Sequence, residues 1–200
     1  MTDLSGPEGV ITRSVGSNRG EARPGPRPTL GRRLTAAASG GVWAAELINY
    51  DIHRYSPLGD LLMTIRRRPE WFSSTSEWTG GTPDSPPNSS IDGVFEDASG
   101  RVWVFARKAR DRWQEAWPKD FPVGREVPYS QGPNDVALWQ TVIEVLDTTT
   151  RHLIASRTID GLVMHVLGSQ KAAMYEEDEN GVPSIRIVSF TVTGPGGRDN

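Results

Sequence analysis

The chain lacks cysteine altogether, which excludes both a disulfide framework and a thiolate metal site. It also contains no apolar run near the roughly 18 residues of a membrane-spanning helix, so we expect no membrane span. Basic residues are not in excess, because the formal net charge is -3. This balance argues against nucleic-acid binding through a broad basic surface. No positively charged stretch leads into an apolar segment near the N-terminus, so no secretory signal is visible.

Catalytic and metal-binding motifs are also scarce. The histidines are His53, His152 and His165, and none has a partner at metal-ligand spacing. The acidic run at residues 176–179 lacks the spaced oxygen ligands of a calcium loop. The sequence contains neither a nucleophile elbow nor a phosphate-binding glycine loop. We therefore predict no catalytic residue, no metal site and no cofactor.

The chain is instead rich in glycine, proline and tryptophan, with 21 Gly, 15 Pro and 7 Trp in 200 residues. Frequent glycine and proline favour many short strands over long helices, and tryptophan suits the faces of sheets. The expected fold class is all-β. The ranges expected as strands are Val42–Leu47, Tyr50–Ser56, Leu61–Arg66, Val94–Asp97, Arg101–Lys108, Val142–Asp147, His152–Arg157, Leu162–Leu167, Ala172–Glu176 and Ile185–Thr193.

An internal repeat strengthens this expectation. The segment SGGVWAAEL at residues 39–47 aligns with SGRVWVFAR at residues 99–107, and both read Ser-Gly-x-Val-Trp before an apolar strand. A further step of about 60 residues reaches Asp160-Gly161-Leu162-Val163. The segments YDIHRYSPLGDLL and VIEVLDTTTRHLI both predict a strand, a polar turn and a strand. Three self-similar units of this kind are typical of a radial or stacked repeat.

These residues carry a resemblance to a known family. The Ser-Gly-x-Val-Trp opening and the hairpin Tyr-x-Ile-x-Arg-Tyr-Ser-x-x-Gly-x-Leu, at residues 50–61, resemble the six-bladed β-propellers of the NHL/TolB-like group. The resemblance implies a partial β-propeller of about three antiparallel blades with long inter-strand loops. A ring of six needs about twice this number, so the chain is expected to be the C-terminal part of a longer protein, or to form a homodimer that completes a ring. The resemblance also implies a bacterial source and an extracytoplasmic place.

The chain divides into three parts. Residues 1–34, rich in Gly, Pro and Arg, are expected to be a flexible tail or the remnant of a preceding blade. Residues 35–194 would form the partial propeller, and residues 195–200 a flexible C-terminus.

Two long connections hold the candidate contact residues. The segment between Lys108 and Val142 and the segment at 69–90 both exceed ordinary loop length and are rich in aromatic residues. Propellers present such loops at the ends of the ring, where they could contact a protein, a peptide or a glycan. In the alternative interpretation, the rings only seal the loops onto the body. The candidate surface consists of Trp71, Trp78, Arg110, Arg112, Trp113 and Trp117.

The predicted function is therefore a noncatalytic ligand-binding, protein-binding or scaffold module. The alternative is a propeller-type hydrolase or lyase with an incomplete axial site. Asp, Glu, His or Arg side chains from all three units, gathered at one axial spot, would favour that alternative.

Overall fold

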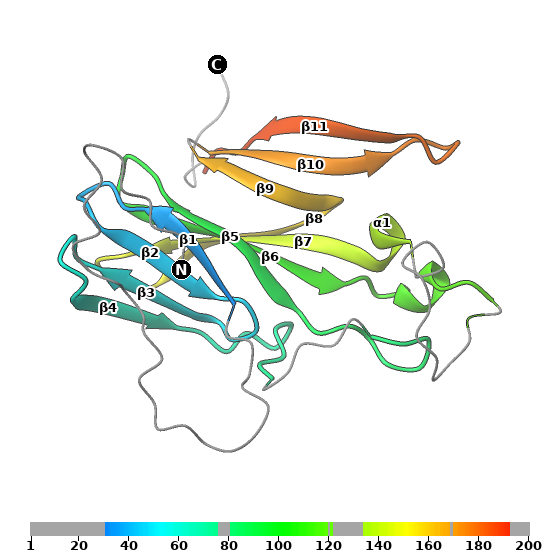
Figure 1. Cartoon of the computed structure of the whole chain (residues 1–200), viewed down its shortest axis with the longest axis horizontal. Helices are drawn as coiled ribbons and strands as arrows, with labels where there is room; N and C mark the ends of the chain where they lie inside the picture. The colour runs from blue at the N-terminus through cyan, green and yellow to red at the C-terminus, as the bar shows by residue number, and fades with distance from the viewer. Residues whose placement is uncertain (1–30, 76–80, 120, 122–133, 169, 193–200) are drawn as a thin grey trace, which may run out of the picture.

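The structure is a computed structural model that describes residues 31–75, 81–119, 121, 134–168 and 170–192. Within these residues the chain is all-β, as the composition predicts, and its strands form three antiparallel sheets that do not close into a barrel (Figure 1). In each sheet, strands adjacent in the chain are adjacent in space. This arrangement is consistent with three blades of a partial propeller.

The first sheet has the order β1-β2-β3-β4 and the second has the order β5-β6-β7-β8, while the third contains β9, β10 and β11. Two short helices, the 3-10 helix η1 and the α-helix α1, lie between β6 and β7. The bounds are β1 Arg32–Ala36, β2 Val42–Glu46, β3 Asp51–Tyr55, β4 Leu61–Arg66, β5 Ser90–Glu96, β6 Arg101–Ala109, η1 Trp113–Ala116, α1 Asp135–Leu138, β7 Trp139–Asp147, β8 Leu153–Asp160, β9 Leu162–Gly168, β10 Lys171–Glu177 and β11 Pro183–Ser189.

The first strand begins earlier than the sequence suggests. β1 starts at Arg32, inside the range predicted to be a tail, and pairs antiparallel with β2 from Arg32 opposite Glu46 to Ala36 opposite Val42. Its sequence, RRLTA, has too little apolar alternation to be recognised alone. Pairing with a strongly apolar neighbour supplies what the local pattern lacks. Residues 1–30 and 195–200 lie outside the described part of the chain.

The repeat holds for two of its three proposed units. Gly40 and Gly100 both have positive φ, 83° and 75°, in the turns that lead into the second strands of their sheets, a conformation that favours glycine. Trp43 and Trp103 occupy equivalent positions in those strands. The third alignment is wrong, because Gly161 leads into β9, the first strand of its sheet. The turn at that equivalent position, before β10, contains Gln170 at φ 60° and has a different sequence.

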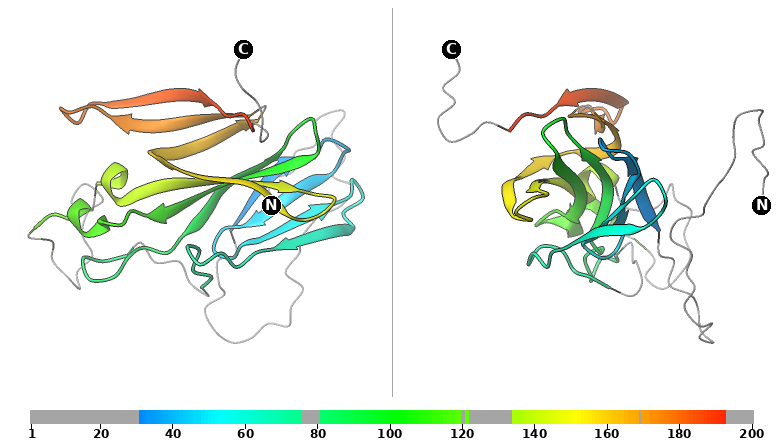
Figure 2. Two further views of the ribbon diagram at one scale, coloured as in Figure 1. Left: turned by 180° about the vertical axis from the view of Figure 1, so that it is seen from behind. Right: turned by 90° about the vertical axis from the view of Figure 1, so that its left-hand side faces the viewer.

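The sheets stack face to face, with their first strands β1, β5 and β9 adjacent (Figure 2). One apolar cluster fills the interface between the first two sheets and a second fills the interface between the second and third. The first contains Trp43, Ile52, Ile65, Val104 and Leu146, among others. The second contains Trp103, Phe105, Ile143, Val163 and Met174, among others. The second sheet is therefore buried on both faces, which explains the nearly continuous apolar sequence of β6 and β7.

The two ends of the sheets differ. Short turns after β1, β3, β5 and β7 lie at one end, and the described parts of the two longest connections, which follow β4 and β6, begin and end at the other. Within the described residues, no helix is long and apolar enough to cross a membrane.

Candidate functional site

The connection between β6 and β7 folds into a platform, which we define as the described residues of 110–138. Its η1 buries Trp113 and Ala116 against Leu138, Trp139 and Leu162. Thus the platform packs on the start of β7 and the start of β9. These apolar contacts fix the polar residues that flank Trp113 in the chain.

Hydrogen bonds hold the second helix of the platform. Asn134 caps α1, because its Oδ1 accepts from the Ala137 N–H at 2.7 Å. The Asn134 side-chain amide also donates to Glu177 of β10 at 3.0 Å. The platform is therefore attached to the third sheet as well as to the second.

Arg110 links the platform to the end of β8. Its Nε donates to the carbonyl oxygens of Val136 and Trp139, both at 3.0 Å. One of its terminal nitrogens lies 3.1 Å from a carboxylate oxygen of Asp160. The guanidinium is thus held in one orientation with its charge directed towards Asp160.

A pocket of about 320 Å³ opens beside Arg110. We call it the platform pocket, and its lining residues are Arg110, Asp111, Arg112, Glu115, Ala137, Gln140 and Asp160. Both arginines predicted from the sequence line it. Two guanidinium groups face three carboxylates there, so the pocket offers hydrogen-bond donors and charged acceptors side by side.

Most charged side chains of the platform pocket other than Arg110 are open to solvent. Arg112 lies 3.2 Å from Glu115, and the two side chains are 82% and 64% exposed. Asp160 is 81% exposed despite its contact with Arg110. Exposed ion pairs contribute little to stability because water competes for the same charges. A ligand could therefore replace these contacts at little cost to the fold.

The two tryptophans of the platform differ in their burial and packing. Trp113 is buried in the apolar cluster, as the sealing interpretation expects, while Trp117 is half-buried and packs edge-to-face on Phe121 at 4.5 Å. Within the described residues, the Nε1 atom of Trp117 is buried without a hydrogen-bond partner. Neither ring lines the platform pocket.

The remaining candidate residues lie elsewhere. Trp71 belongs to the connection between β4 and β5 and packs edge-to-face on Tyr50 and Phe72, at 6.1 and 5.5 Å, between the first two sheets. Trp78 lies outside the described residues. The structure thus brings Arg110, Arg112, Trp113 and Trp117 together and places Trp71 apart from them.

Sequence reasoning did not find Asp160 or Gln140 as members of the site. Asp160 follows Arg110 by 50 residues, and the antiparallel pairing of β7 with β8 brings it to the platform. Thr141 fixes this corner, because its hydroxyl donates to the Gly161 carbonyl at 2.9 Å and accepts from the Val163 N–H at 3.1 Å. The only local signal was the turn glycine at 161.

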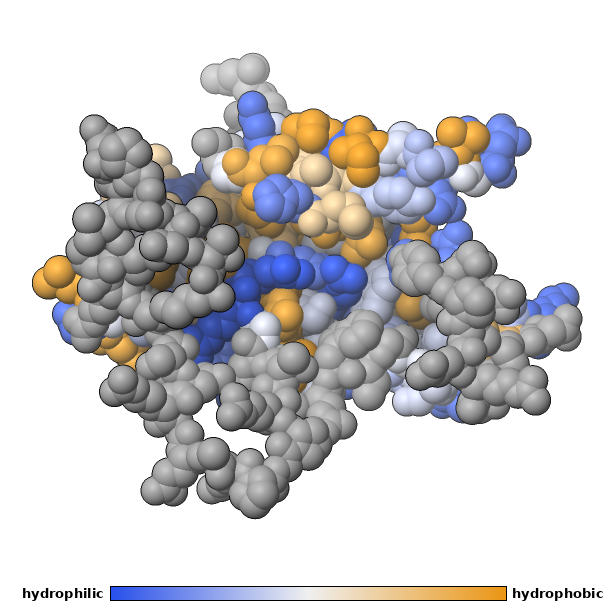
Figure 3. Space-filling view, viewed as in Figure 1, coloured by the Kyte–Doolittle hydropathy of each residue, from blue (hydrophilic) through white to orange (hydrophobic). Residues whose placement is uncertain are grey.

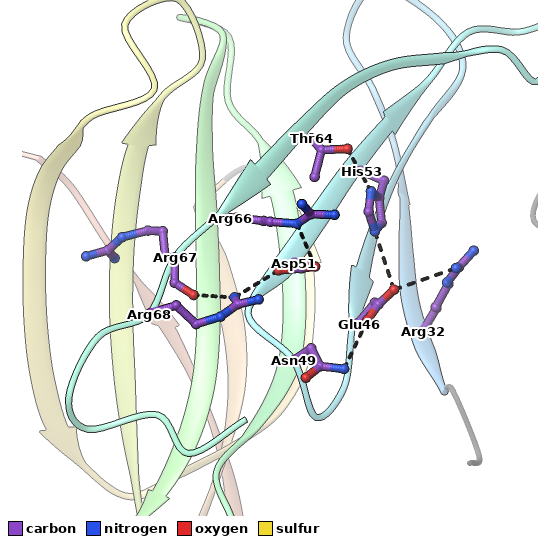
Figure 4. Close-up of polar contacts among 9 residues, drawn as sticks. All are labelled: Arg32, Glu46, Asn49, Asp51, His53, Thr64, Arg66, Arg67 and Arg68. Carbon is purple, nitrogen blue, oxygen red and sulfur yellow. Dashed lines mark hydrogen bonds and ion pairs between the residues drawn. The ribbon is translucent and has the colours of Figure 1, made fainter. Parts of the chain in front are cut away.

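A second polar group covers the outer face of the first sheet (Figure 4). His53 Nδ1 lies 3.0 Å from the Thr64 hydroxyl, and His53 Nε2 lies 3.4 Å from Glu46. Glu46 also contacts Asn49 at 3.2 Å and Arg32 at 3.7 Å. Arg32 lies opposite Glu46, and His53 lies opposite Thr64, on neighbouring strands, where such pairs stabilise a sheet. Each of these polar side chains contacts another member of the group, so the group stabilises the first sheet.

The triple arginine at the end of β4 is divided among several partners. Arg66 and Arg68 donate to the two oxygens of Asp51, at 3.1 and 2.9 Å. Arg67 points between the sheets and pairs with Glu144, whose side chain is only 3% exposed. The Tyr50 hydroxyl donates to the same Glu144 oxygen at 2.5 Å. Burial raises the pKa of Tyr50 far above its ordinary value, against the opposing charge of Arg67, so the hydroxyl remains a donor.

Near the first strands, Asp92 of β5 accepts paired hydrogen bonds from Arg107 of β6, at 2.6 to 2.9 Å. Burial raises the pKa of Asp92, and the hydrogen bonds and charge of Arg107, followed by the charge of Arg33 in β1, oppose that rise. Arg107 also stacks on Trp139 at 5.6 Å. The side chains of this group come from the first and second sheets. The enzyme alternative requires polar side chains from all three sheets at one axial position.

Over the described part of the chain, no group of three or more His, Cys, Asp or Glu residues could hold a metal ion. In comparisons with known proteins, no protein-family model, no curated protein and no solved structure matches this chain.

Proposed function

We propose that the chain is a noncatalytic binding or scaffold module, formed by three successive blades of the C-terminal part of a six-bladed β-propeller. The chain-order sheets and the adjacency of β1, β5 and β9 support the propeller interpretation. The platform pocket is the contact surface, and its ligand is a polar segment of a protein or peptide.

One observation carries this proposal: a rigidly anchored arginine shares a pocket with exposed, weakly paired charges. Arg110 is fixed by two backbone carbonyls and therefore loses little conformational freedom on binding. Arg112, Glu115 and Asp160 are exposed and can exchange partners. A peptide carries amide groups together with side chains of either charge, and both kinds of group find partners here.

The test uses twelve-residue peptides selected by display on the whole chain. We expect their affinity to fall at least tenfold with Asp160→Asn, which removes a pocket charge and leaves the backbone anchors of Arg110 in place. Arg110→Ala should weaken binding further. The matched control is Arg186→Ala, because Arg186 pairs with Glu176 on the third sheet, away from the pocket lining. Equal affinity for wild type and Asp160→Asn would refute the proposed surface, and so would a failure to select any binder.

Ring closure by two copies stays a prediction. Light scattering coupled to size exclusion tests it, because a closed pair would have twice the 22.0 kDa mass of one chain. A single-chain mass at high concentration would contradict the homodimer and leave the platform pocket unaffected.

A further inference from the structure

In the part of the chain that the structure describes, the third sheet has fewer strands than its neighbours. The first two sheets contain four strands each, while the third contains three within the described residues, in the order β11-β10-β9. One edge of β11 pairs with β10 along its whole length, from Pro183 opposite Glu177 to Ser189 opposite Lys171. The other edge of β11 has no neighbouring strand in the described part of the chain.

The fourth strand has a clear role in the other two sheets. In the first sheet, β4 contributes Ile65, which is buried, and Met63, which packs against the cluster between the first two sheets. In the second sheet, β8 contributes Ala155 and Ile159 to the margin of the next cluster. A fourth strand therefore covers the outer part of the interface between neighbouring sheets.

A groove lies beside β11, where the described residues provide no fourth strand. It has a volume of about 380 Å³, and its floor is formed by Trp103, Ile143 and Val145 of the second sheet. One wall consists of residues 155–157 of β8 and the other of residues 189–192. The floor residues belong to the apolar cluster that joins the second and third sheets. The groove is therefore a continuation of an established interface within the chain.

The backbone of β11 presents hydrogen-bonding groups at its free edge. The Phe190 N–H donates to the Gln170 carbonyl at 2.8 Å, and hydrogen-bonded pairs recur at every second residue of an antiparallel ladder. The register of β10 and β11 then directs the N–H and C=O groups of Ile185, Ile187 and Ser189 away from β10. Pro183 has the same orientation, and proline is tolerated at such an outward position because no donor is needed there.

The outer face of this edge is apolar as well. Ile185 and Ile187 are exposed, whereas Val188, on the opposite face, packs towards the second sheet. In Figure 3 hydrophobic residues gather over the third sheet. An uncovered edge with apolar side chains is the kind of surface that pairs with another strand.

We propose that the free edge of β11 and the groove beside it form a docking site for an extended segment of a partner polypeptide. The segment adds a fourth strand to the third sheet by backbone hydrogen bonding, a mode known as β-augmentation. It spans six to eight residues, the lengths of β4 and β8, and carries apolar side chains at alternate positions to fill the groove. Arg157 on the groove wall favours an acidic residue near that end of the segment. The proposal does not depend on the platform pocket.

The probe is a capped peptide with the sequence of β4, LLMTIR, because one face of this strand is entirely apolar. We expect the peptide to slow amide hydrogen exchange of Ile185, Ile187 and Ser189 at least tenfold, measured by NMR on the whole chain. The amides of Arg186 and Val188 already face β10 and should change much less. A control peptide with serine in place of the Met63 and Ile65 counterparts should give no protection.

Two variants separate the backbone from the side chain. Ile187→Pro removes one outward N–H and should weaken peptide binding at least tenfold, while Ile187→Ala keeps that N–H and should bind within threefold of wild type. If Ile187→Pro does not fold, the exchange measurement on the wild-type chain decides the question alone.

Three results would overturn the proposal. The peptide could leave all three amides unchanged. The amides could be protected in the free monomer, which would mean that the chain covers its own edge. They could also become protected only as the mass doubles with concentration, and the occupant would then be a second copy. The platform variant Asp160→Asn should not alter any of these outcomes, so failure of this proposal is distinguishable from failure of the platform pocket.

Discussion

An ion pair between an arginine and a glutamate occurs in two different environments in this molecule. At the interface of the first two sheets, Arg67 pairs with Glu144, which is 3% exposed and also accepts from Tyr50. On the platform, Arg112 pairs with Glu115, and both side chains lie mostly in water. The interface pair is important for the packing around it because removal of Arg67 would leave the buried Glu144 carboxylate without its cation. The platform pair has no such constraint. Burial, rather than residue type, thus decides which charges hold the fold and which remain open to a partner.

Arg67→Ala should have the largest effect on this comparison. It would leave Glu144 buried without its cation, and breaking a buried ion pair in this way typically costs about 3–5 kcal/mol. Urea unfolding of the variant would measure the loss. The double variant Arg67→Ala with Glu144→Gln should recover part of it, because no buried charge remains. A loss for Arg67→Ala below about 1 kcal/mol would contradict the assigned role of the interface pair.

Asp97→Ala should come next. The Asp97 carboxylate accepts from the Trp103 Nε1–H at 2.8 Å, from the Ser99 and Arg101 N–H groups at 2.9 and 3.1 Å, and from the Arg101 side chain. Removing the acceptor would leave the buried indole N–H unpaired, so we expect a loss of about 2–3 kcal/mol in the free energy of unfolding. Asp97→Asn, which keeps one acceptor oxygen, should lose less.

The pH dependence of stability gives a separate check on Asp97. Burial acts to raise its pKa, but the hydrogen bonds from Trp103, Arg101 and Ser99 together outweigh burial and leave the pKa below its ordinary value. A lowered folded-state pKa means that the stabilisation is present above the unfolded-state pKa of about 3.9 and is lost as the pH falls through the folded-state value. The stability difference between wild type and Asp97→Asn should therefore shrink below about pH 4. A difference that stays constant down to pH 2 would contradict this assignment.

Glu96→Gln should have an intermediate effect. Glu96 accepts from Trp43 Nε1–H and from the Ala38 N–H, both at 2.9 Å, and so connects the second sheet to the first. Glutamine keeps an acceptor but loses the charge, so we expect a loss of about 0.5–1 kcal/mol. In double-mutant cycles, Glu96 should couple to Trp43 and Asp97 to Trp103. Coupling of Glu96 to Trp103 instead would contradict the assignment of these carboxylates to their tryptophan partners.

Arg112→Ala should have the smallest effect on stability, about 0.5 kcal/mol or less, because its ion pair is exposed. Thermal unfolding of the variant would show this. In peptide binding the order of the variants reverses, since Arg112→Ala should weaken binding and Glu96→Gln should not. If Arg112→Ala and Glu96→Gln weakened peptide binding equally, the claim that only the exposed platform charges contact the peptide would be contradicted.

Much of the fold was predictable because its signals are local. Turn glycines, alternating strands and the repeated Val-Trp opening identified ten of the eleven strands in the described residues, and Trp43 and Trp103 were correctly matched. β1 was missed because its register depends on β2 rather than on its own apolar pattern. The false third alignment had a turn glycine in common with the other units, but Gly161 leads into β9, the first strand of its sheet, rather than into a second strand.

The site was only partly predictable. Arg110 and Arg112 could be proposed because they stand in a long loop rich in aromatic residues, but Asp160, the acidic partner of Arg110, comes from the end of β8. Trp113 resembles a contact residue in the sequence, yet the apolar surface of Leu138 and Leu162 buries it. Glu144 gave no signal, because its partners Tyr50 and Arg67 lie 94 and 77 residues away. Contacts created by the stacking of sheets leave no local pattern.

The most direct test of the account is an amide-exchange footprint of a display-selected peptide on the whole chain. The account predicts protection at the platform, in residues 110–116 and 134–140 and at Asp160, with the short turns at 37–41 and 97–101 unchanged. Protection confined to those short turns, with the platform exchanging as in the free chain, would contradict the claim that this protein binds through its long-loop end.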